Sequence, residues 1–154
     1  MSEDKYRAAL DMAAKQLSYR ALSAKMLRDK LLAKGHDEEA ADYALAWLTE
    51  RSMLNDELFA ESVVRGYTRK GYGAARIRQM LYAKRIPREL WDEALAELPE
   101  QDDAIDAFLQ KRFRGRQPDR TEIRRAADAL LRRGHAWGDI RRALERYDPD
   151  LPEE

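Results

Sequence analysis

LLAKGH at residues 31–36 recurs as LYAKRI at residues 81–86 and as LLRRGH at residues 130–135, at spacings of 50 and 49 residues. A basic residue followed by glycine is typical of a helix end, because glycine takes the left-handed conformation of a C-terminal turn at little cost. In the middle copy Arg85 stands in place of this glycine. The recurrence predicts three copies of one helical unit.

The residues on either side of these stretches repeat as well, with the apolar spacing of one helix face. Equivalent positions after the turn hold Ala41, Trp91 and Ile140, then Leu45, Leu95 and Leu144, and then Leu48, Leu98 and Tyr147. We therefore expect six leucines to be buried: Leu31, Leu45, Leu81, Leu95, Leu130 and Leu144. Tyr82 takes the place of Leu32 and Leu131, which allows either a ring that lies mostly in the core or an exposed one.

A further helix is expected before each pair, at about 4–18, 56–69 and 101–113. Asn55, Ser23 and Asp37 are candidate N-caps, since their side chains can accept hydrogen bonds from first-turn amides. Residues that favour strands are few. The sequence predicts an all-α fold of three tandem three-helix-bundle repeats in an elongated arrangement. The expected repeats are 1–52, 53–100 and 101–147, followed by an acidic, disordered tail at 148–154.

Charge is distributed unevenly along a chain that has 29 basic and 29 acidic residues. The segment 65–88 holds eight Lys or Arg, no Asp or Glu, and three tyrosines. A second acid-free segment, 111–118, contains Gly and Pro and is expected to be a loop. Such segments are either solvated surface or sites for phosphate and carboxylate groups.

The sequence offers no catalytic constellation. There is no cysteine, so thiolate metal sites and cysteine nucleophiles are excluded. His36 and His135 occupy equivalent turn positions and are interpreted as turn residues. The KGYG stretch at 70–73 lacks the rest of a nucleotide-binding glycine motif, so it is interpreted as the end of one helix and the start of the next. We expect no enzyme activity, no metal and no cofactor.

The N-terminus carries acids where a signal peptide needs basic and then apolar residues. No apolar run approaches the length of a membrane span. These features predict a cytoplasmic protein without a membrane partner.

Several motifs together resemble the RecX family of bacterial recombinase regulators. They are LNDELFA at 54–60, KGYG at 70–73 and the pattern RIRQxLxxKxI at 76–86, supported by Lys34-Gly35 and by LRRG at 131–134. The resemblance covers nearly the whole chain. It implies a non-enzymatic regulator, mostly an inhibitor, that binds the RecA filament on single-stranded DNA and limits filament growth, ATP hydrolysis and strand exchange. It implies a role in DNA repair, recombination and the SOS response.

The basic segments are the expected contact surface for filament and DNA, and the protein is expected to be a monomer. The candidate residues are Arg65, Arg69, Lys70, Arg76, Arg78, Arg85, Arg114 and Arg116. On a continuous helix Arg78, Tyr82 and Arg85 would form one stripe. Two alternatives remain open at this point: a stand-alone helix-turn-helix-like nucleic-acid binder, and a helical scaffold. The zero net charge favours the regulator, because a dedicated DNA binder normally carries a basic excess.

Overall fold

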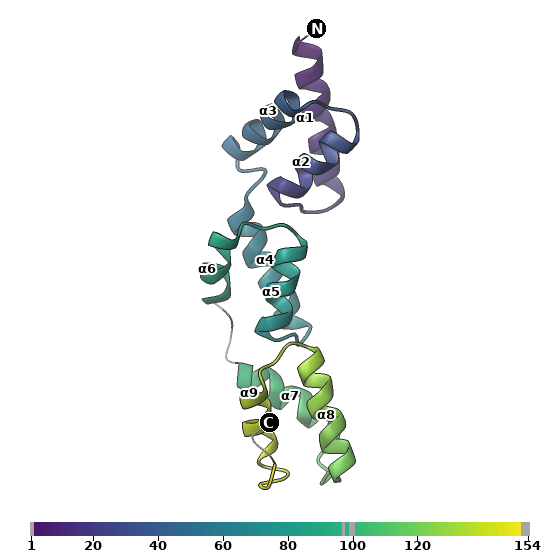
Figure 1. Cartoon of the computed structure of the whole chain (residues 1–154), viewed down its shortest axis with the longest axis vertical. Helices are drawn as coiled ribbons and strands as arrows, with labels where there is room; N and C mark the ends of the chain where they lie inside the picture. Colours follow the sequence, from purple (N-terminus) through teal and green to yellow (C-terminus); the bar gives the residue numbers. More distant parts are fainter. Residues whose placement is uncertain (1, 97, 99–100, 152–154) are drawn as a thin grey trace. The chain divides into compact units, whose positions relative to one another are not determined.

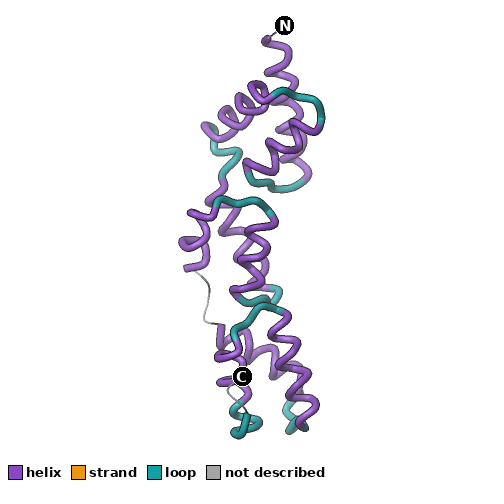
Figure 2. Tube along the Cα trace, viewed as in Figure 1, coloured by secondary structure: helices purple, strands orange, loops and turns teal. Residues whose placement is uncertain are grey.

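A computed structural model describes residues 2–96, 98 and 101–151, and all regular structure within these ranges is helical (Figures 1 and 2). The helices follow one another as α1 Ser2–Tyr19, α2 Ala24–Ala33, α3 Glu38–Glu50, α4 Asp56–Arg69, α5 Ala74–Ala83, α6 Trp91–Ala96, α7 Gln101–Phe113, α8 Arg120–Arg132 and α9 Trp137–Leu144. A short 3-10 turn, Arg88–Leu90, precedes α6. The predicted all-α class and its order of three helices per repeat are confirmed. None of the described helices is both long and apolar enough to cross a membrane.

The chain divides into two compact units. The N-terminal unit comprises Met1–Ser62 together with Leu81–Asp92, and the C-terminal unit comprises Val63–Met80 together with Glu93–Glu154. The middle repeat therefore contributes residues to both units. The repeat boundaries at 52, 100 and 147 and the elongated arrangement stay predictions.

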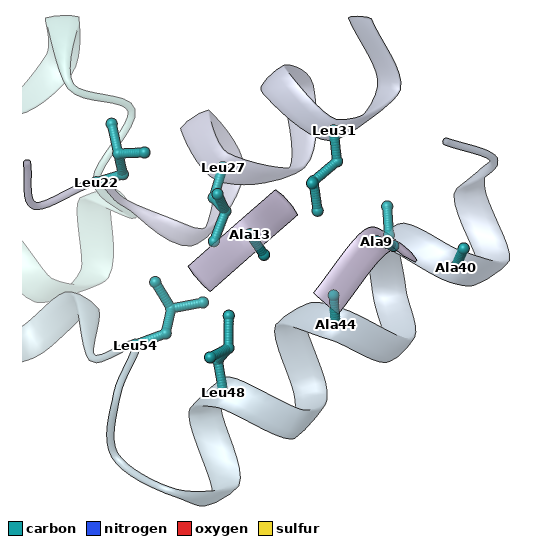
Figure 3. Close-up of a cluster of buried hydrophobic side chains, with 10 residues drawn as sticks. Ala9, Ala13, Leu22, Leu27, Leu31, Ala40, Ala44, Leu48 and Leu54 are labelled. Atoms are coloured by element: carbon teal, nitrogen blue, oxygen red, sulfur yellow. The ribbon is translucent and has the colours of Figure 1, made fainter. Parts of the chain in front are cut away.

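The core of the N-terminal unit is built where α1 packs on α2 and α3. Small residues of α1, Ala9 and Ala13, allow the three helices to approach closely (Figure 3). Leu27 and Leu31 of α2 close this core together with Leu48 of α3. Each of these side chains is fully removed from water. Burial of a leucine or isoleucine stabilises a fold by about 1.5–3 kcal/mol, so this cluster accounts for the ordered packing of the first repeat.

The helix starts follow the predicted capping chemistry. Ser23 Oγ accepts from Met26 N at 3.2 Å, Asp37 Oδ1 accepts from Ala40 N at 2.8 Å, and Asn55 Oδ1 accepts from Leu58 N at 3.1 Å. A further cap, which was not predicted, begins α8: Asp119 and Glu122 form a reciprocal capping box. These bonds satisfy amides that have no partner within the helix.

The C-terminal unit has its own core, which α7, α8 and α9 share. Its largest buried side chain is Phe113, whose ring meets Tyr147 edge-on at 5.0 Å. Leu151 also packs against this core. Residues 148–151 of the acidic tail form a turn in which Asp150 N donates to Asp148 Oδ1, and 152–154 lie outside the described residues, so the expected disorder of the tail stays a prediction.

Four of the six leucines that we expected in the core are fully buried. They are Leu31, Leu81, Leu130 and Leu144. The expectation was wrong for Leu45 and Leu95, which are only partly buried. The preceding alanines, Ala44 and Ala94, are buried in their place. The apolar face covers about a third of the circumference of a helix. A residue one position away from the centre of this face therefore lies at its edge, as Leu45 and Leu95 do.

The turn at 84–86 shows why the repeat pattern survives the loss of its glycine. Gly35 and Gly134 have φ values of 96° and 92°, and Arg85 has a φ of 56°. All three residues thus occupy the left-handed region that the helix end requires. For Arg85 this conformation carries a steric cost that glycine avoids.

Candidate functional site

In the C-terminal unit, the start of α5 lies directly against the turn that follows α8. Gly73 N donates to the carbonyl of Arg133 at 2.7 Å, and Ala75 N donates to the carbonyl of Gly134 at 3.2 Å. A Cβ added to Gly73 would lie 2.5 Å from the backbone of Gly134, and one added to Gly134 would lie 2.3 Å from Arg76 N. Only glycine at both positions permits this approach.

Two side chains of the same turn bind the backbone of the KGYG segment. His135 is 4% exposed, and its Nε2 lies 2.9 Å from the carbonyl of Gly71, to which the ring donates. Arg133 Nη1 donates to the carbonyl of Lys70 at 3.0 Å. The KGYG segment ends α4 and starts α5, as predicted, with Gly71 at a φ of 87°. His135 is a turn residue, as we expected, and it also fixes the segment that precedes α5.

Cations and aromatic rings alternate around this segment. The rings of Tyr67 and Tyr72 meet edge-on at 5.5 Å. Lys70 Nζ lies 5.1 Å from the centre of the Tyr67 ring, and the Arg76 guanidinium lies 5.8 Å from that of Tyr72. Ring faces carry partial negative charge and attract cations, so the tyrosines help to orient the two basic side chains.

Phe108 of α7 provides a third ring. The guanidinium groups of Arg133 and Arg112 lie 5.1 and 5.6 Å from its centre. Arg112 and Arg133 were not among the site residues predicted from the sequence. The available signal was the third copy of the turn, where Arg133 stands at the position of Lys34 and Lys84.

We define the basic cluster as six residues of the C-terminal unit: Lys70, Arg76, Arg112 and Arg133, which contact these rings, and Arg65 and Arg69 of α4, the helix that ends at the KGYG segment. Within the part of the chain that the structure describes, none of them forms an ion pair with a carboxylate. Arg65, Arg69, Lys70 and Arg112 are exposed, whereas Arg76 and Arg133 are partly buried. The cluster therefore presents positive charge that its own unit does not neutralise.

Two basic residues of the N-terminal unit show a different arrangement from that of the basic cluster. Lys5 pairs with Asp37 and Glu39 at 3.0 and 3.2 Å, and Arg28 pairs with Asp42 at 2.8 Å. These bonds raise the pKa of Lys5 and of Arg28 above their ordinary values. Lys5 and Arg28 are thus compensated by carboxylates of their own unit, unlike the six residues of the basic cluster.

The other predicted site residues are dispersed. Arg78 of α5 is partly buried and engaged with other groups of the protein. Arg114 is exposed in the left-handed conformation, with a φ of 51°, and Arg116 lies 3.7 Å from Glu122. Both are in the connection between α7 and α8, the loop that the sequence predicts.

The expected stripe of Arg78, Tyr82 and Arg85 does not form. Helix α5 ends at Ala83, so Arg85 lies beyond it in the turn, and its guanidinium pairs with Asp29 of the N-terminal unit. The prediction assumed that the helix continues for another turn. The positive φ of Arg85 ends it and redirects the side chain.

The chemistry of the basic cluster is that of binding. Guanidinium and ammonium groups make charge-assisted hydrogen bonds to phosphate and carboxylate oxygens. No group of three or more His, Asp and Glu side chains that could hold a metal occurs among the described residues.

Comparison with known proteins matches most of the chain to one family. Family models of RecX match in chain order: the first three-helix domain at residues 9–48, the second at 55–95 and the third at 100–144. Regulatory protein RecX of Stenotrophomonas maltophilia (strain R551-3) is 40% identical over 131 residues, which cover 83% of this chain and 79% of that protein. Regulatory protein RecX of Vibrio parahaemolyticus is 34% identical over 127 residues, with coverage of 80% and 81%.

Crystal structures agree on the fold. RecX from Lactobacillus salivarius superimposes with a TM-score of 0.83 at 22% identity, over 96% of this chain and 99% of that one. A second RecX crystal structure gives a TM-score of 0.77 at 23% identity, over 97% and 75%. The family models and the sequence relatives together show that the chain belongs to the RecX family, as its motifs predicted.

Proposed function

We propose that this protein binds the RecA filament on single-stranded DNA and inhibits filament growth, ATP hydrolysis and strand exchange. Membership of a family whose proteins are named regulatory protein RecX supports a regulatory role. The observation that carries the mode of action is the basic cluster. Among the described residues its six cations have no carboxylate partner, in a chain whose formal net charge is zero.

Local positive charge in a chain of zero net charge suits a partner made of both protein and DNA. A protein that binds DNA alone usually carries a net positive charge, because phosphate neutralisation supplies most of its affinity. A protein that docks on a filament meets protein carboxylates and DNA phosphates together, so it needs local positive surface without a general excess. Cations held over tyrosine and phenylalanine rings are also partly ordered before binding, which lowers the entropic cost of contact.

The proposed action requires no catalytic step by this protein. We propose that it acts as a cytoplasmic monomer by occupying the filament and hindering addition of RecA protomers. A binder that contacts several protomers, or that blocks a growing end, affects more protomers than it contacts. Inhibition is therefore expected at substoichiometric amounts.

The test is RecA-dependent ATP hydrolysis on single-stranded DNA, measured at one fixed salt concentration while this protein is titrated. We expect the hydrolysis rate to decrease when fewer than one molecule of this protein is present per RecA protomer. Filament extension should slow at the same ratios. Unchanged hydrolysis and extension, with the protein shown to be bound to the filament, would exclude the proposed inhibition. A stand-alone helix-turn-helix-like binder would instead bind duplex DNA in the absence of RecA and leave RecA turnover unaffected.

A further inference from the structure

A hollow of about 510 Å³ lies in the N-terminal unit, and none of the residues that line it belongs to the basic cluster. Its wall combines aromatic and basic side chains: Tyr82, Trp91, Lys25, Arg85 and Arg88, with Pro87 between them. Every one of these residues belongs to the N-terminal unit. The volume falls in the range of about 300–1,000 Å³ that is usual for small-ligand sites.

The two aromatic residues of the hollow are held differently. Trp91 is largely buried, and its Nε1 donates to the carbonyl of Ile86 at 3.0 Å, so it forms a fixed wall. Tyr82 is 74% exposed. A large aromatic ring left in water gains free energy when a flat partner covers it. The equivalent positions of the other two repeats hold leucines, so the repeat architecture itself does not require an aromatic ring at this site.

The charged residues of the hollow are all cations. Lys25 comes from α2, and Arg85 and Arg88 flank Pro87. No carboxylate is among the described residues that line the hollow. Asp29, which pairs with Arg85, compensates one of the three charges, and a guanidinium with five N–H donors can bind a second anion at the same time. The hollow therefore retains an excess of positive charge.

We propose that this hollow binds one nucleotide of single-stranded nucleic acid, with the base stacked on Tyr82 and the adjoining phosphates near Lys25 and Arg88. An exposed aromatic ring beside cations is the arrangement with which proteins bind single strands without sequence preference. A duplex does not fit, since its bases are stacked on one another and do not offer a free face. The inference rests on the proposed function for its biological substrate, because single-stranded DNA is the strand in the filament. It adds a DNA contact that needs no RecA.

The test is fluorescence anisotropy of a labelled thymidine oligonucleotide with the full-length protein and no RecA. The same titration uses an abasic oligonucleotide of equal length, which keeps the phosphates and lacks the bases. The wild-type protein is expected to bind the thymidine strand more tightly than the abasic strand. Tyr82→Leu should weaken binding of the thymidine strand roughly 5- to 100-fold and remove the preference for it, whereas Tyr82→Phe should retain both.

Tyr19→Leu is the matched control, because Tyr19 is 69% exposed in the same unit and does not line the hollow. It should bind both strands as the wild type does. Helicity by circular dichroism and the melting temperature should stay unchanged for all three variants, since each altered ring is exposed. Equal binding of the thymidine strand by Tyr82→Leu and the wild type would overturn the proposal, and so would equal binding of thymidine and abasic strands by the wild type.

RecA turnover on the same variants separates this proposal from the proposed function. Loss of the base preference in Tyr82→Leu supports the pocket even if the wild-type protein leaves RecA turnover unchanged, a result that would exclude only the proposed function. If the wild type inhibits RecA but Tyr82→Leu binds both strands as the wild type does, the pocket is excluded and the proposed function stands. If the wild type binds no free strand and Tyr82→Leu weakens filament binding, the hollow takes a protein partner, and the nucleotide proposal is wrong.

Discussion

Ser23 and Lys84 are joined by a hydrogen bond of 2.6 Å, in which Ser23 Oγ donates to the backbone carbonyl of Lys84. The same hydroxyl accepts from Met26 N and so caps α2. In the C-terminal unit the equivalent residues are Gly73 and Arg133, and Gly73 N donates to the carbonyl of Arg133. In both units, therefore, the start of one repeat's second helix binds the turn of the next repeat.

Replacement of Ser23 by alanine tests this double role. Ser23→Ala removes the cap of α2 and leaves the Lys84 carbonyl without this donor, so we expect a loss of about 1–3 kcal/mol in the free energy of unfolding. Asn55→Ala is the matched control, because within the described part of the chain the Asn55 side chain makes only the capping bond to Leu58 N. It should cost about 1 kcal/mol. Urea unfolding measures both. Equal losses would show that the bond to Lys84 contributes nothing measurable.

Gly73 offers a test in the C-terminal unit. A methyl group at this position would overlap the backbone of Gly134, so Gly73→Ala should destabilise the protein by about 1–3 kcal/mol. Gly66 lies inside α4 with open space around it. Gly66→Ala should therefore stabilise by about 0.5–1 kcal/mol, because alanine is the better helix former. Thermal unfolding of both variants checks the signs, and a neutral Gly73→Ala would contradict the close approach.

Leu81 tests the repeat pattern. It is fully buried, like its equivalents Leu31 and Leu130, so Leu81→Ala should cost about 2–5 kcal/mol. Leu131 is adjacent to Leu130 in sequence but 45% exposed. Leu131→Ala should lower the free energy of unfolding much less, because a smaller part of the Leu131 side chain is buried. Similar losses from the two substitutions in denaturant unfolding would be inconsistent with the helix phase described above.

A cluster of charges in the N-terminal unit predicts sensitivity to acid. Donation by Ala40 N and then by Lys5 lowers the pKa of Asp37, and donation by Tyr6 and then by Lys5 lowers the pKa of Glu39. A carboxylate with a lowered pKa stabilises the fold above its unfolded pKa, and this contribution disappears as the pH falls through its folded pKa. We therefore expect the melting temperature to decrease when the pH is lowered below about 4.

Lys5→Met with Tyr6→Phe removes two of these three donors and keeps much of the apolar contact. Between pH 6 and about pH 3 the melting temperature of the double variant should decrease less than that of the wild type. The comparison is made by circular dichroism across this range. Parallel pH profiles of the two proteins would show that these groups do not cause the acid sensitivity.

The sequence predicts features that are set locally. Caps at Ser23, Asp37 and Asn55 and the turn at KGYG depend on residues within one helical turn, and each is confirmed. Contacts between segments distant in sequence were not predictable in this way. The bonds of Ser23 to Lys84 and of His135 to Gly71 span more than 60 positions. Nothing in the local pattern distinguishes either side chain from an ordinary cap or turn residue.

Four residues of the basic cluster were candidates from the sequence, because they lie in one continuous segment of the chain. The acid-free segment indicated Arg65, Arg69, Lys70 and Arg76, which the structure leaves without carboxylate partners among the described residues. Arg85 was wrongly expected on a stripe with Arg78 and Tyr82, because its pairing with Asp29 depends on the fold of the N-terminal unit. Arg112 lies one helical turn from Phe108 within α7, whereas Arg133 reaches the same ring only because the fold brings the turn after α8 to α7.

The central claim is that the basic cluster binds the RecA filament. The most direct measurement is binding of this protein to preassembled filaments on single-stranded DNA at two salt concentrations, with Arg65→Ala/Arg69→Ala compared with the charge-matched control Lys15→Ala/Arg20→Ala. All four residues are exposed, so folding should change by less than about 1 kcal/mol per residue. The account predicts that only the first variant binds more weakly, with a salt slope flatter by about one unit for each lost phosphate contact. Equal affinity and equal slope for both folded variants and the wild type, or no binding by the wild type, would contradict it.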